Sequence, residues 1–223
     1  MVLKGAVEES QSPYFVSPIF VVTKKSGGMR PIIYLKKLNR FLHIEHFKLE
    51  NLCLIRELLN ANMWLAKIDL EDAYYSVTIH SEDRKFLQFR WQGKLYQYCS
   101  LPVGLATAPF VFTKLLKPVV AFLRAQGLRL IRYLDDMLLM SSLQEDLSEE
   151  LTLCANTLTW CGYTINTKKS MFTPVQEIEF LGVLINSKNM TLGTPLDKRE
   201  KVTQLAQHLL NAEVVKLREI ARF

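Results

Sequence analysis

The sequence has few cysteines and none of the signals of secreted or membrane proteins. Its 223 residues include four cysteines, with no Cys-x-x-Cys pair and no histidine at zinc-finger spacing from any of them. We therefore expect no disulfide framework, and instead an intracellular protein, cytoplasmic or nuclear, with free and mostly buried thiols. No basic-then-apolar leader begins the chain, and prolines and a glycine interrupt the longest uncharged run, Leu95–Thr113. Neither a signal peptide nor a membrane partner is predicted.

Acidic residues are absent from two long stretches. None occurs from Ser10 to Ile44 or from Arg84 to Leu134, whereas lysines and arginines recur in both, and the net charge is +6. Such segregated positive charge favours a polyanionic partner, and nucleic acid is the natural one. The alternative at this point is a set of solvated basic side chains with no ligand.

Hydrophobic residues make up 49% of the chain and charged residues 22%, which is typical of a globular domain. Runs of β-type residues alternate with segments of helical periodicity. We predict strands over residues 19–23, 29–35, 64–69, 73–79, 87–91, 95–99, 129–133, 137–141, 177–180 and 183–186, and helices over 49–62, 106–126, 143–161 and after 195. This order predicts an α+β fold with a central antiparallel sheet.

Two adjacent carboxylates lie between two apolar strands, at Asp135 and Asp136 in the run Tyr133-Leu134-Asp135-Asp136. Burying two ionised groups that repel each other costs several kcal/mol unless a cation compensates them. A divalent metal ion would do so. The alternative is a solvated hairpin tip, where aspartate is a common turn residue.

A third carboxylate, Asp69, also ends an apolar strand. If the two strands are neighbours in one sheet, Asp69 and Asp135 converge. Carboxylate oxygens favour hard cations such as Mg²⁺. Two such ions about 4 Å apart activate a 3′-hydroxyl and stabilise a leaving pyrophosphate. Together with the basic stretches, this predicts phosphoryl transfer on a nucleic-acid template.

Five segments, in order, resemble motifs of reverse transcriptases and cover roughly residues 15–190. They are Phe20–Ile33 with Leu38-Asn39, Ile68–Tyr75, Leu101–Phe110, Tyr133–Asp136, and Gly162–Ser170 with Phe180-Leu181-Gly182. The closest similarity is to retrotransposon enzymes of the LTR and tyrosine-recombinase (DIRS-type) elements. Viral RNA replicases, which favour glycine before the aspartate pair, fit less well.

The resemblance implies a right-hand polymerase fold. Fingers would occupy part of residues 10–60, an antiparallel-sheet palm with inserted fingers elements residues 61–190, and a partial helical thumb or connection residues 191–223. The implied activity is RNA-directed DNA synthesis by nucleotidyl transfer onto a primer 3′-hydroxyl. The expected partners are an RNA or DNA template with primer, deoxynucleoside triphosphates, and further polymerase or RNase H domains or a second copy of the chain.

The resemblance also implies residue roles. Asp69, Asp135 and Asp136 would be catalytic and, with the Leu70 carbonyl, would hold two Mg²⁺ ions, for which Mn²⁺ is a substitute. Nucleotide contacts would come from Lys24, Lys25, Arg30, Asp72, Ala73, Tyr74, Val103, Gly104 and Lys169. Template or primer contacts would come from Pro102, Tyr133, Leu181 and Gly182.

Two of these roles carry a specific expectation. The ring of Tyr74 would lie under the deoxyribose and exclude a 2′-hydroxyl, while strand alternation would turn Tyr75 to the opposite face. Gly104 would allow a close approach of the backbone to template or nucleotide.

The sequence departs from the family pattern at two positions. Tyr34 stands where an aspartate is usual, and Val103 where phenylalanine or glutamine is usual. The chain also ends at Phe223, where we expect no RNase H domain to follow. The alternative function is therefore a catalytically degraded nucleic-acid-binding relic or a structural subunit of a larger polymerase.

Overall fold

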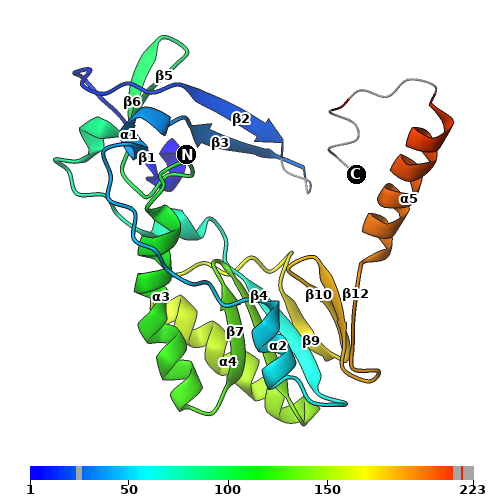
Figure 1. Ribbon diagram of the computed structural model, residues 1–223. Helices are drawn as coiled ribbons and strands as arrows, with labels where there is room; N and C mark the ends of the chain where they lie inside the picture. Colours follow the sequence, from blue (N-terminus) through cyan, green and yellow to red (C-terminus); the bar gives the residue numbers. More distant parts are fainter. Residues whose placement is uncertain (24–26, 213–216, 218–223) are drawn as a thin grey trace.

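A four-stranded antiparallel sheet forms the centre of the computed structural model, which describes residues 1–23, 27–212 and 217 (Figure 1). We call it the palm sheet, and its strand order is β7-β8-β4-β9. Its strands are β4 (Trp64–Asp69), β7 (Arg129–Tyr133), β8 (Asp136–Ser141) and β9 (Met171–Val175). Because both faces of the sheet are covered, β4 and β8 are almost continuously apolar.

The two faces of the palm sheet carry separate cores. Ala66 and Ile68 of β4 pack toward α3 (Ala108–Ala125) and α4 (Gln144–Trp160). Leu65, which precedes Ala66 in β4, packs on the other face with α2 (Leu52–Leu58) and the hairpin of β10 (Glu177–Phe180) and β11 (Val183–Asn186). The strand β12 (Thr191–Gly193) extends that hairpin to a three-stranded sheet.

Two smaller sheets form the fingers. They lie beyond the end of the palm sheet at which β4 ends with Asp69 and β8 begins with Asp136 (Figure 1). One is the hairpin of β2 (Ile19–Thr23) and β3 (Met29–Ile33); the other has the order β1-β6-β5. The second sheet consists of β1 (Val7–Glu9), β5 (Gln88–Trp91) and β6 (Lys94–Tyr98). Short helical turns complete this region: η1 (Val2–Lys4), α1 (Lys36–Asn39), η2 (Ala73–Ser76) and η3 (Arg84–Phe86).

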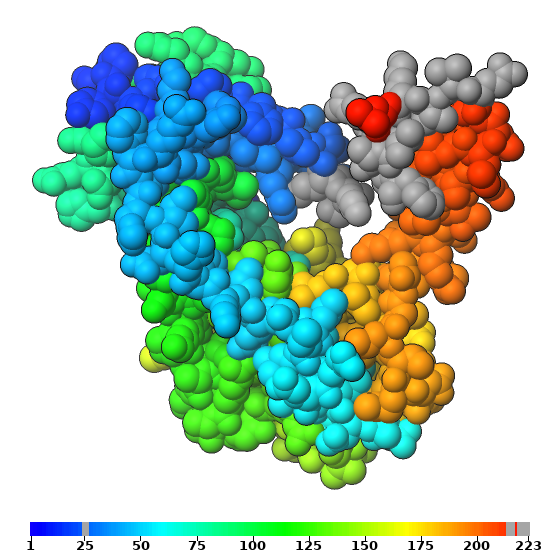
Figure 2. All heavy atoms as spheres, in the orientation of Figure 1, coloured from blue at the N-terminus to red at the C-terminus, as the bar shows by residue number. Residues whose placement is uncertain are grey.

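The last described helix, α5 (Leu196–Asn211), stands across from the fingers (Figure 1). None of its residues is buried within the described part of the chain. The space-filling view is hollowed between the fingers, the palm and α5 (Figure 2). No helix among the described residues is long and apolar enough to span a membrane.

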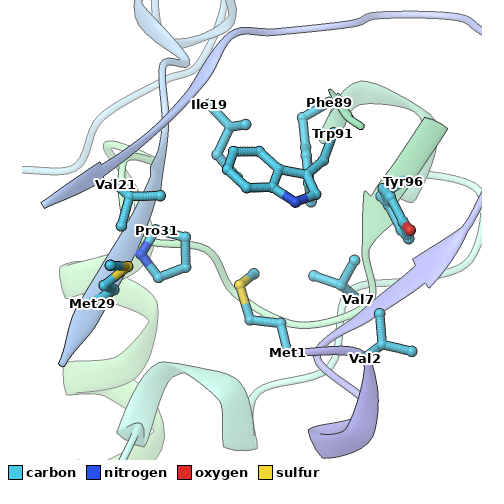
Figure 3. Close-up of a pocket in the computed structure, with 10 residues that line it drawn as sticks. All are labelled: Met1, Val2, Val7, Ile19, Val21, Met29, Pro31, Phe89, Trp91 and Tyr96. Carbon is cyan, nitrogen blue, oxygen red and sulfur yellow. The ribbon is translucent and has the colours of Figure 1, made fainter. Parts of the chain in front are cut away.

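An apolar pocket of about 330 Å³ opens between the two fingers sheets (Figure 3). Its lining consists of Met1, Val2, Val7, Ile19, Val21, Met29, Pro31, Phe89, Trp91 and Tyr96. Among the described residues, none of those predicted to bind metal, nucleotide or template lines this pocket, so it is separate from the carboxylates.

Three sequence predictions are wrong. Residues 73–79 are not a strand, because Tyr75 N–H donates to Asp72 O (2.7 Å) and the Ser76 hydroxyl to Ala73 O (2.6 Å), which closes the short helix η2. The helix expected over 49–62 is only Leu52–Leu58, since the Asn51 side chain caps its start. The thiols are not mostly buried, because Cys53 and Cys161 are exposed.

Candidate active site

Asp69 and Asp136 are paired residues of two neighbouring strands. Asp69 ends β4, Asp136 begins β8, and the two face each other in the antiparallel register. The preceding pair, Ile68 and Met137, is fully buried, so both carboxylates lie where the core meets the hollow below the fingers. The two strands are therefore neighbours in one sheet, and the partner of Asp69 in register is Asp136 rather than Asp135.

Asp69 is held by a later segment of the chain. Its N–H donates to the Ser170 hydroxyl at 3.0 Å, and its carbonyl oxygen accepts from the Asn166 N–H at 2.8 Å. Its side chain is nearly buried, and Lys169 Nζ lies 3.5 Å from Oδ2. Oδ1 is buried and has no hydrogen-bond partner among the described residues. One carboxylate oxygen is thus left available for a ligand.

Asp135 is presented by a tight turn between β7 and β8. Tyr133 pairs with Asp136 across it, and Leu134 adopts the left-handed conformation with φ of 53°. The Asp135 carbonyl oxygen accepts from the Leu70 N–H at 2.9 Å. This bond joins the turn to the residue after Asp69, so the two carboxylate-bearing segments form one unit.

The pKa values of Asp135 and Asp136 are raised above the ordinary value for aspartate. Burial, followed by repulsion from Asp135 and Asp69, raises the pKa of Asp136 to about 6. Burial also raises the pKa of Asp135, with a contribution from Asp69, while Lys169 and Arg30 act in the opposite direction. The site therefore holds more negative charge than its own lysines and arginine neutralise, which favours an added cation.

The donor set fits a hard divalent cation, because it consists of three carboxylates. One of them, Asp69, has a buried Oδ1 with no hydrogen-bond partner among the described residues. Within residues 1–23, 27–212 and 217, however, no three His, Cys, Asp or Glu side chains are already gathered as a closed ligand cluster. Metal binding at Asp69, Asp135 and Asp136 would thus need these side chains to move. The Leu70 carbonyl, predicted as a further ligand, stays a prediction.

Tyr74 lies beside these carboxylates. Its ring packs edge-on against Phe112 with ring centroids 5.5 Å apart. Burial, with Asp135 and Tyr133 nearby, raises its pKa to about 12. Tyr75 packs instead with the fingers core. The two rings diverge as expected, but for a different reason. The segment is a 3₁₀-helix, in which successive side chains are about 120° apart, and not a strand with alternating side chains.

Gly104 makes its close approach to the protein itself. Its φ is 116°, and a Cβ there would collide with the carbonyl oxygen of Ile33 at the end of β3. Asn39 Nδ2 donates to Gly104 O, and Asn39 Oδ1 accepts from the Ala106 N–H, each at 3.0 Å. Glycine is thus required at position 104 because the loop packs against the end of β3, and no contact with template or nucleotide is needed to explain it.

The remaining predicted residues that the structure describes come from β3, the loop before α3 and the turn between β10 and β11. Arg30 is exposed on β3, and its charge acts on both Asp135 and Tyr74. Pro102 is buried and Val103 half-buried in the loop before α3. Leu181 and Gly182 form the turn between β10 and β11, where Gly182 O accepts from Lys198 Nζ at 2.7 Å. Lys24 and Lys25 lie outside the described residues.

One charged residue at the site was missed by the sequence analysis. Lys4 donates to the carboxylates of Glu71 and Asp72, which follow Asp69 in the chain. No motif of the sequence signals this contact, because the partners are 67 and 68 residues apart.

The antiparallel palm sheet, the fingers and the carboxylate site together define a right-hand polymerase fold. A sequence model of the family described as reverse transcriptase (RNA-dependent DNA polymerase) matches residues 22–185. This is most of the chain, and the chain therefore belongs to that family.

Curated relatives include polyproteins of mobile elements and a virus. The chain is 27% identical over 211 residues to the retrovirus-related Pol polyprotein from transposon gypsy of Drosophila melanogaster, covering 92% of this chain and 19% of the relative. It is 27% identical to the enzymatic polyprotein of Soybean chlorotic mottle virus (92% and 30%) and 24% to the transposon Tf2-3 polyprotein of Schizosaccharomyces pombe (85% and 14%). It thus spans less than a third of each, and corresponds to a retrotransposon-type reverse transcriptase domain.

Solved structures support the same fold. The foamy viral protease-reverse transcriptase in complex with double-stranded DNA matches with a TM-score of 0.82 and 20% identity, covering 99% of this chain and 37% of that one. The same viral enzyme in complex with an RNA/DNA hybrid matches with a TM-score of 0.77 and 20% identity, over 98% of this chain and 28% of that one.

Proposed function

We propose that this domain synthesises DNA on an RNA template by adding deoxynucleotides to a primer 3′-hydroxyl. The observation that carries the proposal is the juxtaposition of Asp69 and Asp136 in register, with Asp135 in the adjoining turn. Acids gathered in this way repel one another, and such a cluster with raised pKa values at Asp135 and Asp136 is typical of a functional site.

Asp69, Asp135 and Asp136 would hold two Mg²⁺ ions with the Leu70 carbonyl. When bound, such ions lower the pKa of the primer hydroxyl and neutralise the charge of the leaving pyrophosphate. The protein's own part is to bring carboxylates from two strands to one place and to keep them partly desolvated, where their charge attracts cations most strongly.

Nucleotide binding would use the groups that surround the carboxylates. Arg30, on β3, would contact the triphosphate, for which a guanidinium suits bidentate contact. Lys169 would reach the leaving phosphate once its contact with Asp69 is replaced by a metal ion. Tyr74 would support the sugar, with Asp72, Ala73, Val103 and Gly104 around the same pocket.

Template and primer would lie in the hollow between fingers, palm and α5. The solved relatives bound to double-stranded DNA and to an RNA/DNA hybrid support this partner class. Tyr133, Pro102 and the Leu181-Gly182 turn are the contacts we assign to them. The acid-free basic segments of the chain would supply phosphate contacts.

The test is primer extension by the purified chain on an RNA template with Mg²⁺ and deoxynucleoside triphosphates. Extension that requires both the metal and the template supports the proposal. Binding of the primer–template with no extension, in Mg²⁺ or in Mn²⁺, would instead identify a nucleic-acid-binding relic.

A further inference from the structure

Lys4 forms the most direct charged contact between the N-terminal segment and the active-site region. Its Nζ donates to Asp72 Oδ2 at 2.7 Å and to Glu71 Oε1 at 2.9 Å. The exposed fractions of the three side chains are 54% for Lys4, 30% for Asp72 and 44% for Glu71. One ammonium group therefore pairs with two adjacent carboxylates that begin two residues after Asp69, and it offsets half of their charge.

The backbone of Lys4 is fixed by the fingers. Gly5, with φ of 67°, ends η1 by donating its N–H to Val2 O. Ala6 and Val7 follow and are buried, and Ala6 O accepts from the Cys99 N–H at 2.9 Å. The strand β1 then pairs with β6. The backbone of Lys4 is thus anchored, through the residues that follow it, to a sheet of the fingers.

Asp72 is a sensitive place for such a contact. Its backbone is left-handed, with φ of 48°, a conformation that a non-glycine residue adopts at a cost. It starts the turn η2, which carries Ala73 and Tyr74 beside the carboxylate site. Without Lys4, two uncompensated negative charges would stand next to the path of an incoming triphosphate, and the turn would lose a bond that holds it.

We propose that Lys4 is a positioning residue of the nucleotide site: it fixes the turn at Asp72 and reduces the repulsion that Glu71 and Asp72 would exert on the triphosphate. The inference rests on the proposed function, since it names a determinant of nucleotide binding at the same site. Lys4 itself does not contact the reacting atoms.

The experiment compares the full chain with three variants in single-nucleotide extension. Lys4→Met should raise KM for the deoxynucleoside triphosphate about fivefold, with kcat changed less than about twofold, because the ion pairs are partly exposed and act on binding alone. Lys4→Arg, which keeps the charge, should restore KM to within about twofold of the parent. Lys94→Met is the matched control, because Lys94 forms a similarly exposed ion pair with Glu9 at 3.0 Å in the fingers.

Amide hydrogen exchange over residues 71–77, without nucleotide, gives a second measurement independent of activity. Exchange should be faster in Lys4→Met than in the parent and in Lys94→Met. The role of Lys4 would be overturned if Lys4→Met had the same KM for the deoxynucleoside triphosphate as the parent, or if Lys94→Met raised this KM equally. It would also be overturned if amide exchange over residues 71–77 were unchanged in Lys4→Met. Absence of extension by the parent would instead overturn the proposed function, whatever the exchange shows.

Discussion

Asp69 and Asp136 face each other across the central strand pair of the palm sheet, β4 and β8. They are 67 positions apart in sequence, yet the register places them at the same level of the sheet. Antiparallel pairing joins the end of one strand to the start of the next, so each strand contributes one acid to the same edge. The predictions below depend on this pairing and on the residues that surround it.

Asp135→Asn should reduce primer extension at least about a hundredfold, because the substitution removes a carboxylate that would hold the metal ions. Affinity for the primer–template should stay within about twofold of the parent, since the change removes little phosphate contact. Extension rates and filter-binding constants measure the two effects. Asp146→Asn, an exposed acid on α4, is the control and should extend at the parent rate; an active Asp135→Asn would contradict the assignment.

Asp136→Asn should stabilise the metal-free protein at neutral pH. The pKa of Asp136 is about 6 in the folded protein, whereas an aspartate in an unfolded chain has the ordinary value of 3.8. The folded protein therefore binds more protons between these values, and the charged carboxylate costs stability increasingly as pH rises from about 4 to about 6. The gain for the variant should be on the order of 2 kcal/mol at pH 7.5 and close to zero near pH 4.

Urea unfolding of parent and Asp136→Asn in a chelator, at both pH values, measures this difference. Saturating Mg²⁺ at pH 7.5 should reduce it, since the cation stabilises only the parent's carboxylate. A gain that is the same at both pH values would show that charge at Asp136 is not its cause.

Tyr74→Val should raise ribonucleotide incorporation relative to deoxyribonucleotide about tenfold to a hundredfold. The ring would exclude an oxygen at the 2′ position, and overlap of this kind costs roughly 1–3 kcal/mol. The ratio of kcat/KM for the two nucleotides is the measurement. Tyr75→Val is the control, because Tyr75 packs with the fingers core and should affect stability more than sugar choice. Relaxed selectivity in Tyr75→Val alone would show that the wrong ring was assigned.

Gly104→Ala should destabilise the domain more than Gly93→Ala. Both glycines have positive φ, but only at Gly104 would the added Cβ meet another group, the Ile33 carbonyl oxygen. The difference between the two variants isolates that collision, and we expect it to be roughly 1–3 kcal/mol. Equal free energies of unfolding would mean that the loop moves away from β3 at no cost.

The parts of the fold that depend on local pattern could be predicted from the sequence. The apolar run of β4 with its terminal Asp69 can be predicted in this way, and so can the hairpin of β10 and β11, because hydrophobic period and turn residues specify them. The strand predicted over residues 73–79 is wrong, because tyrosines and β-branched residues are typical of strands. Hydrogen bonds from Tyr75 and Ser76 close a helical turn there instead.

The contacts around the site could not be predicted in the same way. The contact of Lys4 with Asp72 depends on how the fingers fold back onto the palm, which no local spacing encodes. The same is true of Gly104, whose glycine signal was recognised but whose neighbour, Ile33, belongs to another sheet.

The support of Asp69 by Ser170 has a consequence for the way the protein is made. The two residues are 101 positions apart, and β8 and β9, which flank β4, also follow it by a long interval. During synthesis β4 therefore leaves the ribosome with both edges unpaired, and its apolar side chains stay exposed until the later strands have been translated. Such long-range pairing is slow and exposes the nascent chain to aggregation. Fragments that end before Val175, the last residue of β9, should accumulate as insoluble protein, because β4 then keeps one edge unpaired.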